Sequence, residues 1–333
     1  MKNIPYNIVG LLKDRILVLD GAMGTMIQKL KFDESDYRGD RFKNYNSSLK
    51  GNNDLLSLTQ PEAIFNIHKQ YLDAGADIIE TNTFSSTSIA MADYDMESLV
   101  YELNYESARL AKKATKKYKN NSTKPRFVAG SIGPTNKTAS MSPDVNNPGY
   151  REVNFDDLVN SYTEQIIGLI NGGVDILLVE TVFDTLNAKA ALFAIENYKN
   201  KNLLDIPVMI SGTITDASGR TLSGQTLEAF VTSISHINLL SIGLNCALGA
   251  EQLYPYIKKL SMITDLNISV HPNAGLPNEF GEYDQNPEQM QNLIRDYLKN
   301  SLVNIIGGCC GTTPDHIRLI AEIANDYSIR KTN

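Results

Sequence analysis

The chain lacks the long apolar runs, the positive charge and the paired cysteines that mark several classes of protein. No apolar run approaches the roughly 20 residues that a transmembrane helix needs, and the N-terminus, MKNIPYNIVG, does not resemble a signal peptide. A formal net charge of −7 argues against nucleic acid or an anionic membrane as a partner. Three cysteines, an odd number, fit a reducing compartment better than a disulfide framework. We therefore expect a cytoplasmic protein.

Internal repeats, low-complexity tracts and an interdomain linker are also lacking. The 333 residues exceed the usual size of a domain, but barrels of alternating strands and helices commonly reach this length as one unit. With 42% hydrophobic residues the chain can bury a large core. We expect a single domain over residues 1–333.

Short β-rich runs recur along the whole chain. Each run opens with continuous apolar residues, as strands buried on both faces do, and closes on polar or glycine residues. The eight runs are ILVLDG from Ile16, DIIETNTF from Asp77, RFVAGSIGP from Arg126, DILLVETVFD from Asp175, PVMISGTI from Pro207, SIGLNCA from Ser241, NISVHPNAG from Asn267 and VNIIGGCCG from Val303.

Helical patterns separate these runs. The clearest is NPEQMQNLIRDYLKN, which starts with an Asn286 cap and Pro287 and places Met290, Leu293, Ile294, Tyr297 and Leu298 on one face. The segment TTPDHIRLIAEIAN has the same kind of helix start, with Thr313 as the cap and Pro314 after it. Strand and helix alternating eight times predicts an α/β fold, a closed parallel (β/α)8 TIM barrel. A doubly wound open sheet is the alternative.

Two connections that follow strands are unusually long, at about residues 28–58 and 134–155. In a barrel both lie over the carboxyl-terminal face of the strands, where active sites form. Loops of this length without an obvious element of their own tend to be functional lids.

All three cysteines fall at predicted strand ends. Cys246 ends the sixth run, and Cys309 and Cys310 end the eighth, so the thiols belong to the same rim of the barrel. Strands six and eight are one strand apart, roughly 10 Å at ~4.8 Å per strand, a distance that barrel curvature and side-chain length can shorten. Three thiolates with a fourth position open are typical of a catalytic zinc site.

Other interpretations of the cysteines remain open at this point. Buried free cysteines are commonly small hydrophobic residues, and a vicinal disulfide between Cys309 and Cys310 is conceivable although strained. The spacing is not that of a zinc finger.

Several longer motifs resemble the homocysteine-binding module of the cobalamin-dependent methionine synthases, from about Ile16 to Ile323. They are LVLDGAMGTMIQ, GADIIETNTF, GPTNKTASMSPDV, VETVFDTLNAKAAL, SGTITDASGRTLSGQT, GLNCALG, HPNAGLPNEFGEYD and GGCCGTTPDHI. The DG turn, the NC strand and the GGCCG ending are shared with the wider homocysteine S-methyltransferase family. The segments RGDRFKNYNSSLKGNNDLLSLTQPEAI and HPNAGLPNEFGEYD resemble the cobalamin-dependent branch more specifically.

This resemblance implies a (β/α)8 barrel with Zn²⁺ bound by Cys246, Cys309 and Cys310 and homocysteine as the methyl acceptor. It also implies that Asn273 is an exchangeable fourth ligand, although an amide that only orders its loop is an equal alternative. A free thiol has a pKa of about 8.5, and zinc coordination removes its proton. An electron-rich bound thiolate suits a sulfur that must attack a methyl group.

The amino-acid part of homocysteine needs its own partners. Asp20 and Glu180 end strands one and four, and their carboxylates can pair with the substrate ammonium. The turn Asp20–Gly21–Ala22–Met23–Gly24 offers backbone N–H groups, and its glycines allow a ligand to approach. The alternative is that Asp20 caps a turn that the glycines merely shape. A nucleotide-binding loop is disfavoured, because GAMG is not GxGxxG.

Further polar residues belong to the surroundings of this rim. We expect Glu80, Asn82 and Asn245 to organise it as outer-shell partners. His271 is not needed as a ligand. The remaining histidines, in helical stretches, are expected at the surface or with satisfied partners in the core; they are His68, His236 and His316.

Nothing in the chain resembles a cobalamin site, because the D-x-H-x-x-G pattern is absent. If the resemblance holds, methylcobalamin must be presented by another domain or subunit, alongside a folate-binding module. The chain is then expected to be part of a longer protein or a separate subunit. The alternatives are a self-sufficient enzyme that uses S-methylmethionine or another small donor, and a non-catalytic zinc- or thiol-binding protein.

Overall fold

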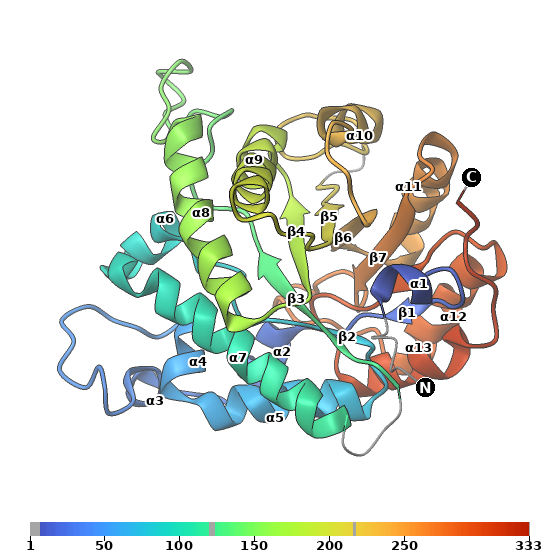
Figure 1. Cartoon of the computed structure of the whole chain (residues 1–333), viewed down its shortest axis with the longest axis horizontal. Coiled ribbons are helices and arrows are strands. Elements are labelled where there is room, and N and C mark those ends of the chain that lie inside the picture. Colours follow the sequence, from blue (N-terminus) through green and yellow to red (C-terminus); the bar gives the residue numbers. More distant parts are fainter. Residues whose placement is uncertain (1–6, 120–123, 216–217, 333) are drawn as a thin grey trace.

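The structure, a computed structural model, describes residues 7–119, 124–215 and 218–332. These residues form an eight-stranded parallel sheet surrounded by helices (Figure 1). The strands are β1 (Leu17–Val18), β2 (Ile78–Glu80), β3 (Phe127–Ile132), β4 (Ile176–Val182), β5 (Val208–Gly212), β6 (Ser241–Gly249), β7 (Asn267–Asn273) and β8 (Ile305–Ile306). Each of the eight predicted runs contains one strand.

The sheet closes on itself. The strand order is β1-β8-β7-β6-β5-β4-β3-β2, so sequential strands are neighbours throughout. A parallel bridge between Leu19 and Ile78 joins the remaining pair, β1 and β2. The predicted (β/α)8 TIM barrel is confirmed, and the open doubly wound alternative is wrong, because that sheet would reverse its strand order at a switch point.

Helices follow the strands in the expected alternation. The α-helices are α1 (Ile8–Leu11), α2 (Met23–Lys29), α3 (Glu34–Arg38), α4 (Leu56–Thr59), α5 (Pro61–Asp73), α6 (Ser88–Met91), α7 (Val100–Lys119), α8 (Phe155–Gly172), α9 (Thr185–Asn202), α10 (Leu227–Ile234), α11 (Ala250–Ile263), α12 (Pro287–Lys299) and α13 (Pro314–Ala324). Short 3₁₀ helices are η1 (Asn53–Leu55), η2 (Ala92–Tyr94) and η3 (Glu97–Leu99). The predicted cap of α12 is present, since Asn286 accepts a hydrogen bond from the Gln289 N–H. None of the helices in the described ranges has the length and apolar character needed to cross a membrane.

Strand side chains alternate between two apolar layers. Leu17 and Leu19 belong to the cluster inside the barrel, whereas Val18 belongs to the cluster between the strands and the outer helices. This alternation follows from the two-residue period of a strand. Ile8 and Leu12 join the inner cluster, so α1 packs against the amino-terminal end of the barrel. The opposite end, where the strands terminate, is left for polar residues.

The amino-terminal end of the barrel is also tied together by polar side chains at strand starts. Asp77, just before β2, accepts from the Val18 N–H at 3.0 Å, and Asp175, before β4, accepts from the Val128 N–H at 2.8 Å. Asn304 accepts from the Ile268 N–H in the same manner. Each bond joins a strand to its neighbour and supports the register that brings the strand ends to one rim.

The two long connections differ from each other in structure. Residues 28–58 are expected from the sequence to lack elements of their own, but they contain α3, η1 and most of α4. Asp33 caps α3 and accepts from the Asp36 N–H, while Glu34 accepts the backbone N–H groups of Leu49 and Lys50. Residues 134–154 carry no helix or strand and project beyond the start of α8 (Figure 1). Both segments lie at the carboxyl-terminal end of the strands.

Candidate active site

The three cysteine thiols lie together at the carboxyl-terminal rim. Their sulfur atoms are all within 4.8 Å of one another, and the sulfurs of Cys246 and Cys310 are 3.7 Å apart. All three cysteines are free, so the vicinal disulfide is not present. Cys246 lies inside β6, three residues before its end, and Cys309 and Cys310 follow β8 by three and four residues. β7 lies between these strands, as predicted.

An irregular backbone at β6 turns Cys246 toward the other two thiols. Cys246 and Ala247 both have left-handed backbone conformations, with φ of 60° and 57°, and the pairing with β7 shifts between Asn245 and Gly249. Such a bulge re-aims a side chain, and two consecutive non-glycine residues with positive φ indicate a strained backbone held by its surroundings.

Glycines before Cys309 allow the end of β8 to pass between its neighbours. A Cβ atom on Gly307 would lie 2.7 Å from the Leu19 Cβ, so β1 leaves no room for a side chain there. The Gly308 N–H donates to the Asp20 carbonyl and the Cys309 N–H donates to the Pro272 carbonyl at 2.8 Å. The cysteine pair is therefore fixed between β1 and β7.

Asn245 supports this region from β6. Its side chain is fully buried, its amide oxygen accepts from the Thr181 N–H at 3.0 Å, and its amide nitrogen donates to the Thr181 hydroxyl at 2.8 Å. The same amide nitrogen lies 3.9 Å from the Cys309 sulfur. This placement fits the predicted outer-shell role. Asn82 instead joins β2 to the 28–58 segment, because its amide donates to the Asn53 carbonyl at 2.8 Å.

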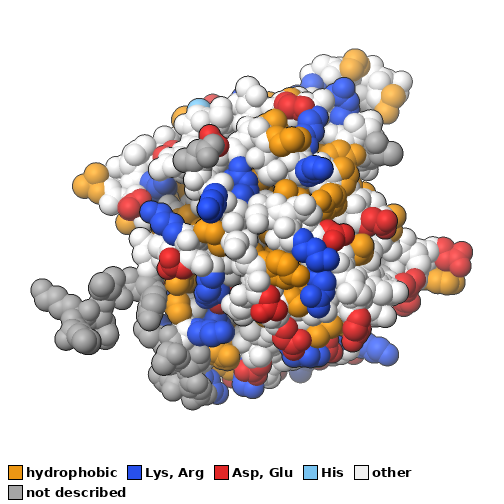
Figure 2. Space-filling model, turned by 90° about the vertical axis from the view of Figure 1, so that its right-hand side faces the viewer, with side chains coloured by type: hydrophobic (Ala, Val, Ile, Leu, Met, Phe, Trp, Pro, Cys, Tyr) orange, Lys and Arg blue, Asp and Glu red, His pale blue; other side chains and the backbone are white. Residues whose placement is uncertain are grey.

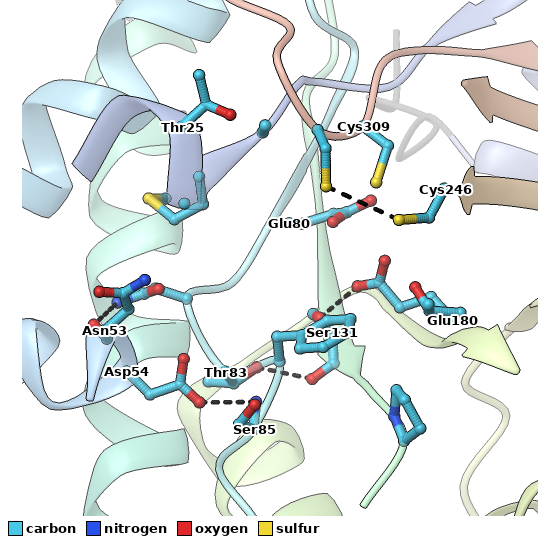
Figure 3. Close-up of a pocket in the computed structure, with 18 of the residues that line it drawn as sticks. Thr25, Asn53, Asp54, Glu80, Thr83, Ser85, Ser131, Glu180, Cys246 and Cys309 are labelled. Atoms are coloured by element: carbon cyan, nitrogen blue, oxygen red, sulfur yellow. Dashed lines mark hydrogen bonds between the residues drawn. The ribbon is translucent and has the colours of Figure 1, made fainter. Parts of the chain in front are cut away.

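Carboxyl groups form a second cluster in the same cavity, with Asp20 and Glu180 buried and Glu80 half-buried (Figure 3). The Glu80 N–H donates to Asp20 at 3.0 Å, and the Ser131 hydroxyl donates to Glu180 at 2.5 Å. Burial raises the pKa of Asp20 and of Glu80 well above its ordinary value, and it raises that of Glu180 to about 7. Carboxyl groups in this state favour a cationic ligand, whose charge would let them ionise.

The turn after β1 has one N–H group already engaged. The Ala22 N–H donates to the Thr312 hydroxyl at 3.2 Å. Met23, Gly24 and Thr25, the first residues of α2, line the cavity. A Cβ on Gly21 would lie 2.7 Å from the Thr312 hydroxyl and 2.9 Å from the Tyr71 ring. Gly21 is therefore required by packing, whereas the position at Gly24 is open.

Asn273 and His271 present buried polar atoms without partners in the described part of the chain. The side-chain oxygen of Asn273 and the Nε2 of His271 accept or donate no hydrogen bond there, and both residues are about 1% exposed. Burial lowers the pKa of His271 to about 3, so its ring is neutral. His271 also lies with Glu80 and Glu180 in a group whose ligand atoms are within 4.8 Å of one another. The sequence pattern alone does not indicate a role for this histidine.

The other histidines have different environments. His316 is satisfied, since its ring contacts the Thr313 hydroxyl and the Gln285 carbonyl, and His236 is exposed. His68 is fully buried on α5, and neither ring nitrogen has a partner among the described residues. The expected satisfied core role is therefore wrong for His68.

The thiols and carboxyl groups line one cavity of about 780 Å³. Its outer wall includes residues that the sequence did not single out, among them Asn53 and Asp54 of η1, Tyr94 of η2 and Tyr283 after β7. Asp54 is buried and accepts from the Ser85 N–H at 2.7 Å and the Ser86 hydroxyl at 2.9 Å, and burial raises its pKa to about 6. The signals in the sequence are the position of this segment after a strand and its resemblance to the cobalamin-dependent branch, neither of which assigns a role to Asp54 itself.

The sequence pattern of the homocysteine S-methyltransferases matches residues 17–324. The chain belongs to the homocysteine S-methyltransferase family. This membership supports methyl transfer to homocysteine, and the cysteine cluster supplies groups able to hold a metal ion.

Solved structures of the Escherichia coli homocysteine methyltransferase MmuM have the same fold. Its metallated form is 24% identical with a TM-score of 0.72, and the match covers 94% of this chain and 97% of that one. Its oxidized form is 23% identical with a TM-score of 0.74, covering 95% and 99%. At this identity the likeness extends to the fold alone.

Proposed function

We propose that this chain is the homocysteine-activating part of a cobalamin-dependent methionine synthase. In this proposal Cys246, Cys309 and Cys310 hold Zn²⁺, and homocysteine bound beside them receives a methyl group from methylcobalamin carried by another domain or subunit. The observation that carries the proposal is the convergence of three free thiols in a cavity that also contains buried carboxyl groups.

The residues present fit a zinc ion. Three sulfur donors and one open position form a catalytic donor set, and the unpartnered oxygen of Asn273 is a candidate for the fourth ligand. Bound there, Zn²⁺ would remove the proton from the homocysteine thiol and keep its sulfur nucleophilic at neutral pH.

Protein groups would orient the rest of the substrate. Asp20 and Glu180 are proposed to bind the ammonium group, with Glu80 adjacent to both. The N–H groups of Met23 and Gly24, at the start of α2, are proposed to bind the carboxylate. The positive charge of a bound ammonium group would favour the ionised form of these carboxyl groups. It would thereby counteract the increase in their pKa values that burial causes.

The shape of the rim supports a large methyl donor delivered by a partner. Exposed apolar side chains stand on loops after several strands, including Phe84 after β2, Val145 and Tyr150 after β3, Leu222 after β5 and Phe280 after β7. Val145 is 94% exposed and Phe280 80% exposed. Apolar surface around a cavity mouth is typical of an interaction site. On the face seen in Figure 2, Lys and Arg side chains lie among Asp and Glu, with hydrophobic side chains between them.

A small cationic donor such as S-methylmethionine is the second candidate. The described lining of the cavity contains Asp20, Asp54, Glu80, Asp93 and Glu180 and no lysine or arginine. Such a lining favours a sulfonium group and is compatible with a self-sufficient enzyme. A non-catalytic zinc- or thiol-binding protein is the third candidate.

One assay separates the three. Purified protein, zinc and homocysteine are mixed with free methylcobalamin or with S-methylmethionine, and methionine is measured. We expect slow turnover with methylcobalamin, faster turnover when a carrier domain supplies it, and none in Cys309→Ser. Efficient turnover with S-methylmethionine alone would overturn the proposal, and no turnover with either donor or a supplied carrier would favour the third candidate.

A further inference from the structure

A group of oxygen and nitrogen donors lies in the cavity and contains no sulfur. A carboxylate oxygen of Glu80, a carboxylate oxygen of Glu180 and a ring nitrogen of His271 are all within 4.8 Å of one another. The three residues line the cavity that also contains the cysteines, and the two carboxyl groups can be followed in Figure 3. The proposed contacts with homocysteine use Glu180 but give His271 no part.

The strands aim these three side chains at the mouth of the barrel. The residue before each of them belongs to the apolar layer between the strands and the outer helices; these preceding residues are Ile79, Val179 and Val270. Successive side chains of a strand point to opposite faces, so Glu80, Glu180 and His271 face the inside of the barrel. Three separate strands, β2, β4 and β7, therefore supply one donor each, and a barrel wall holds such donors more precisely than a loop does.

Two buried polar atoms in and beside this group have no partner among the described residues. One is the Nε2 of His271, which is about 1% exposed. The other is the Oδ1 of Asp20, a buried residue whose second oxygen accepts from the Glu80 N–H at 3.0 Å. Buried polar atoms in folded proteins nearly always have a partner, and those that lack one point to a bound solvent molecule or ion.

The donors have the chemistry of a divalent-cation site. The described lining of the cavity contains no lysine or arginine, so none of its side chains balances the carboxylates with a fixed positive charge. First-row divalent ions hold nitrogen and oxygen donors at about 2.0–2.2 Å, so donors around one ion lie up to about 4.4 Å apart. Two carboxylates and an imidazole suit Mn²⁺, whereas thiolates select zinc.

We propose that Glu80, Glu180 and His271 form a second divalent-cation site, weaker than the thiol cluster, which competes with the ammonium group of homocysteine. The competition rests on the proposed function, in which Glu180 binds that ammonium group, but binding of the cation does not. A divalent ion between the two carboxylates supplies the positive charge that the ammonium would otherwise bring. Excess divalent metal should therefore oppose the binding of homocysteine at this end of the cavity.

Mn²⁺ is the probe, because it prefers oxygen and nitrogen donors and leaves the thiols to zinc. Protein treated with one equivalent of Zn²⁺ is titrated with Mn²⁺, and the free ion is measured by electron paramagnetic resonance. We expect one Mn²⁺ per chain in the wild type and a dissociation constant raised about tenfold or more in His271→Gln and in Glu80→Gln. Asp93→Asn is the matched control, since Asp93 is an exposed carboxylate of the same cavity outside this group, and it should bind Mn²⁺ as the wild type does.

A second readout identifies the donor directly. Pulsed electron paramagnetic resonance should detect a histidine nitrogen coupled to the bound Mn²⁺ in the wild type and in Asp93→Asn, and the coupling should be absent in His271→Gln. Circular dichroism verifies that each variant is folded. No saturable Mn²⁺ binding in the wild type, or equal binding in the wild type, His271→Gln and Glu80→Gln, would overturn the second site whatever the methyl-donor assay shows.

The competition is tested by repeating the Mn²⁺ titration with homocysteine, using protein-free samples to correct for Mn²⁺ that homocysteine itself binds. The apparent dissociation constant for Mn²⁺ should rise with the concentration of homocysteine. Mn²⁺ that stays bound while calorimetry shows homocysteine binding would overturn the competition. Homocysteine that fails to bind even without Mn²⁺ would instead count against the proposed function, and the results with His271→Gln and Glu80→Gln would still decide the cation site.

Discussion

Replacing Asp77 by asparagine tests how the barrel is closed between β1 and β2. These two strands share the single Leu19–Ile78 bridge, so the side chain of Asp77 is an important link between them. It accepts two hydrogen bonds from Arg15, at 2.6 and 2.8 Å, and one from Arg126 at 2.6 Å. The side chains of Asp77 and Arg126 are each only 4% exposed.

The size of the expected loss of stability in Asp77→Asn follows from the burial of Arg126. Asparagine keeps one oxygen to accept from the Val18 N–H, but it leaves the Arg126 guanidinium without a countercharge, with the Tyr118 ring and the Pro125 carbonyl at 3.5 Å as its remaining interaction partners in the described part of the chain. Removing one partner of a buried ion pair costs about 3–5 kcal/mol. With an unfolding entropy of about 2.1 cal/mol/K per residue, a loss of about 4 kcal/mol lowers the melting temperature of a chain of this length by about 6 °C.

The matched control is Asp175→Asn. Asp175 has the same position before β4, but its pair with Lys112 is 31% and 22% exposed, and a pair of this kind contributes about 1 kcal/mol or less. Urea denaturation of the wild type and both variants measures how much each substitution lowers the free energy of unfolding. Equal losses in the two variants, each below about 1 kcal/mol, would refute the reasoning that a buried guanidinium depends on Asp77.

Three further predictions concern the rim. Ala247→Gly relieves a left-handed alanine, so the free energy of unfolding in denaturant should rise by about 0.5 kcal/mol; a loss would show that the bulge is not strained. Burial raises the pKa of Asp54 from 3.8 in the unfolded chain to about 6, so protonated Asp54 contributes about 3 kcal/mol to the free energy of unfolding below pH 3.8. This contribution is lost as the pH rises through about 6. Asp54→Asn should therefore flatten the pH dependence of stability in this range, and an unchanged profile would contradict the prediction. Asp20→Asn and Glu180→Gln should weaken homocysteine binding in calorimetry while metal analysis shows zinc retained; unaltered affinity would exclude the proposed ammonium site.

The arrangement of the barrel could be predicted because each strand is a short apolar run buried on both faces. The same pattern placed Cys246, Cys309 and Cys310 at one rim, since parallel strands end on the same side. Strand lengths could be predicted less well than strand positions. The strands β1 and β8 have two residues each, although their apolar runs are longer.

Features that depend on tertiary contacts could not be predicted. The left-handed conformations of Cys246 and Ala247 are imposed by the bulge against β7, and neither residue favours them intrinsically. The entry of Asp54 into the cavity depends on how the 28–58 segment folds back on Ser85. Gly21 lines the cavity, but the packing that leaves no room for a side chain there could not be predicted, because its close neighbours Thr312 and Tyr71 come from distant parts of the chain.

The predicted domain extent, residues 1–333, stays a prediction, as do the zinc, substrate and outer-shell roles assigned to individual residues. The matched range of 17–324 agrees with one unit over most of the chain. Delivery of methylcobalamin by a partner likewise remains a proposal, and the donor assay tests it.

The central claim is that Cys246, Cys309 and Cys310 together hold one zinc ion. It is tested most directly by measuring the zinc content of the wild type and of the three single Cys→Ser variants, with circular dichroism to verify that each barrel is folded. The account predicts one zinc per chain in the wild type and a marked loss in every variant with the fold retained, because the thiols lie on the rim and not in the packed core. Full zinc retention in all three variants would contradict it.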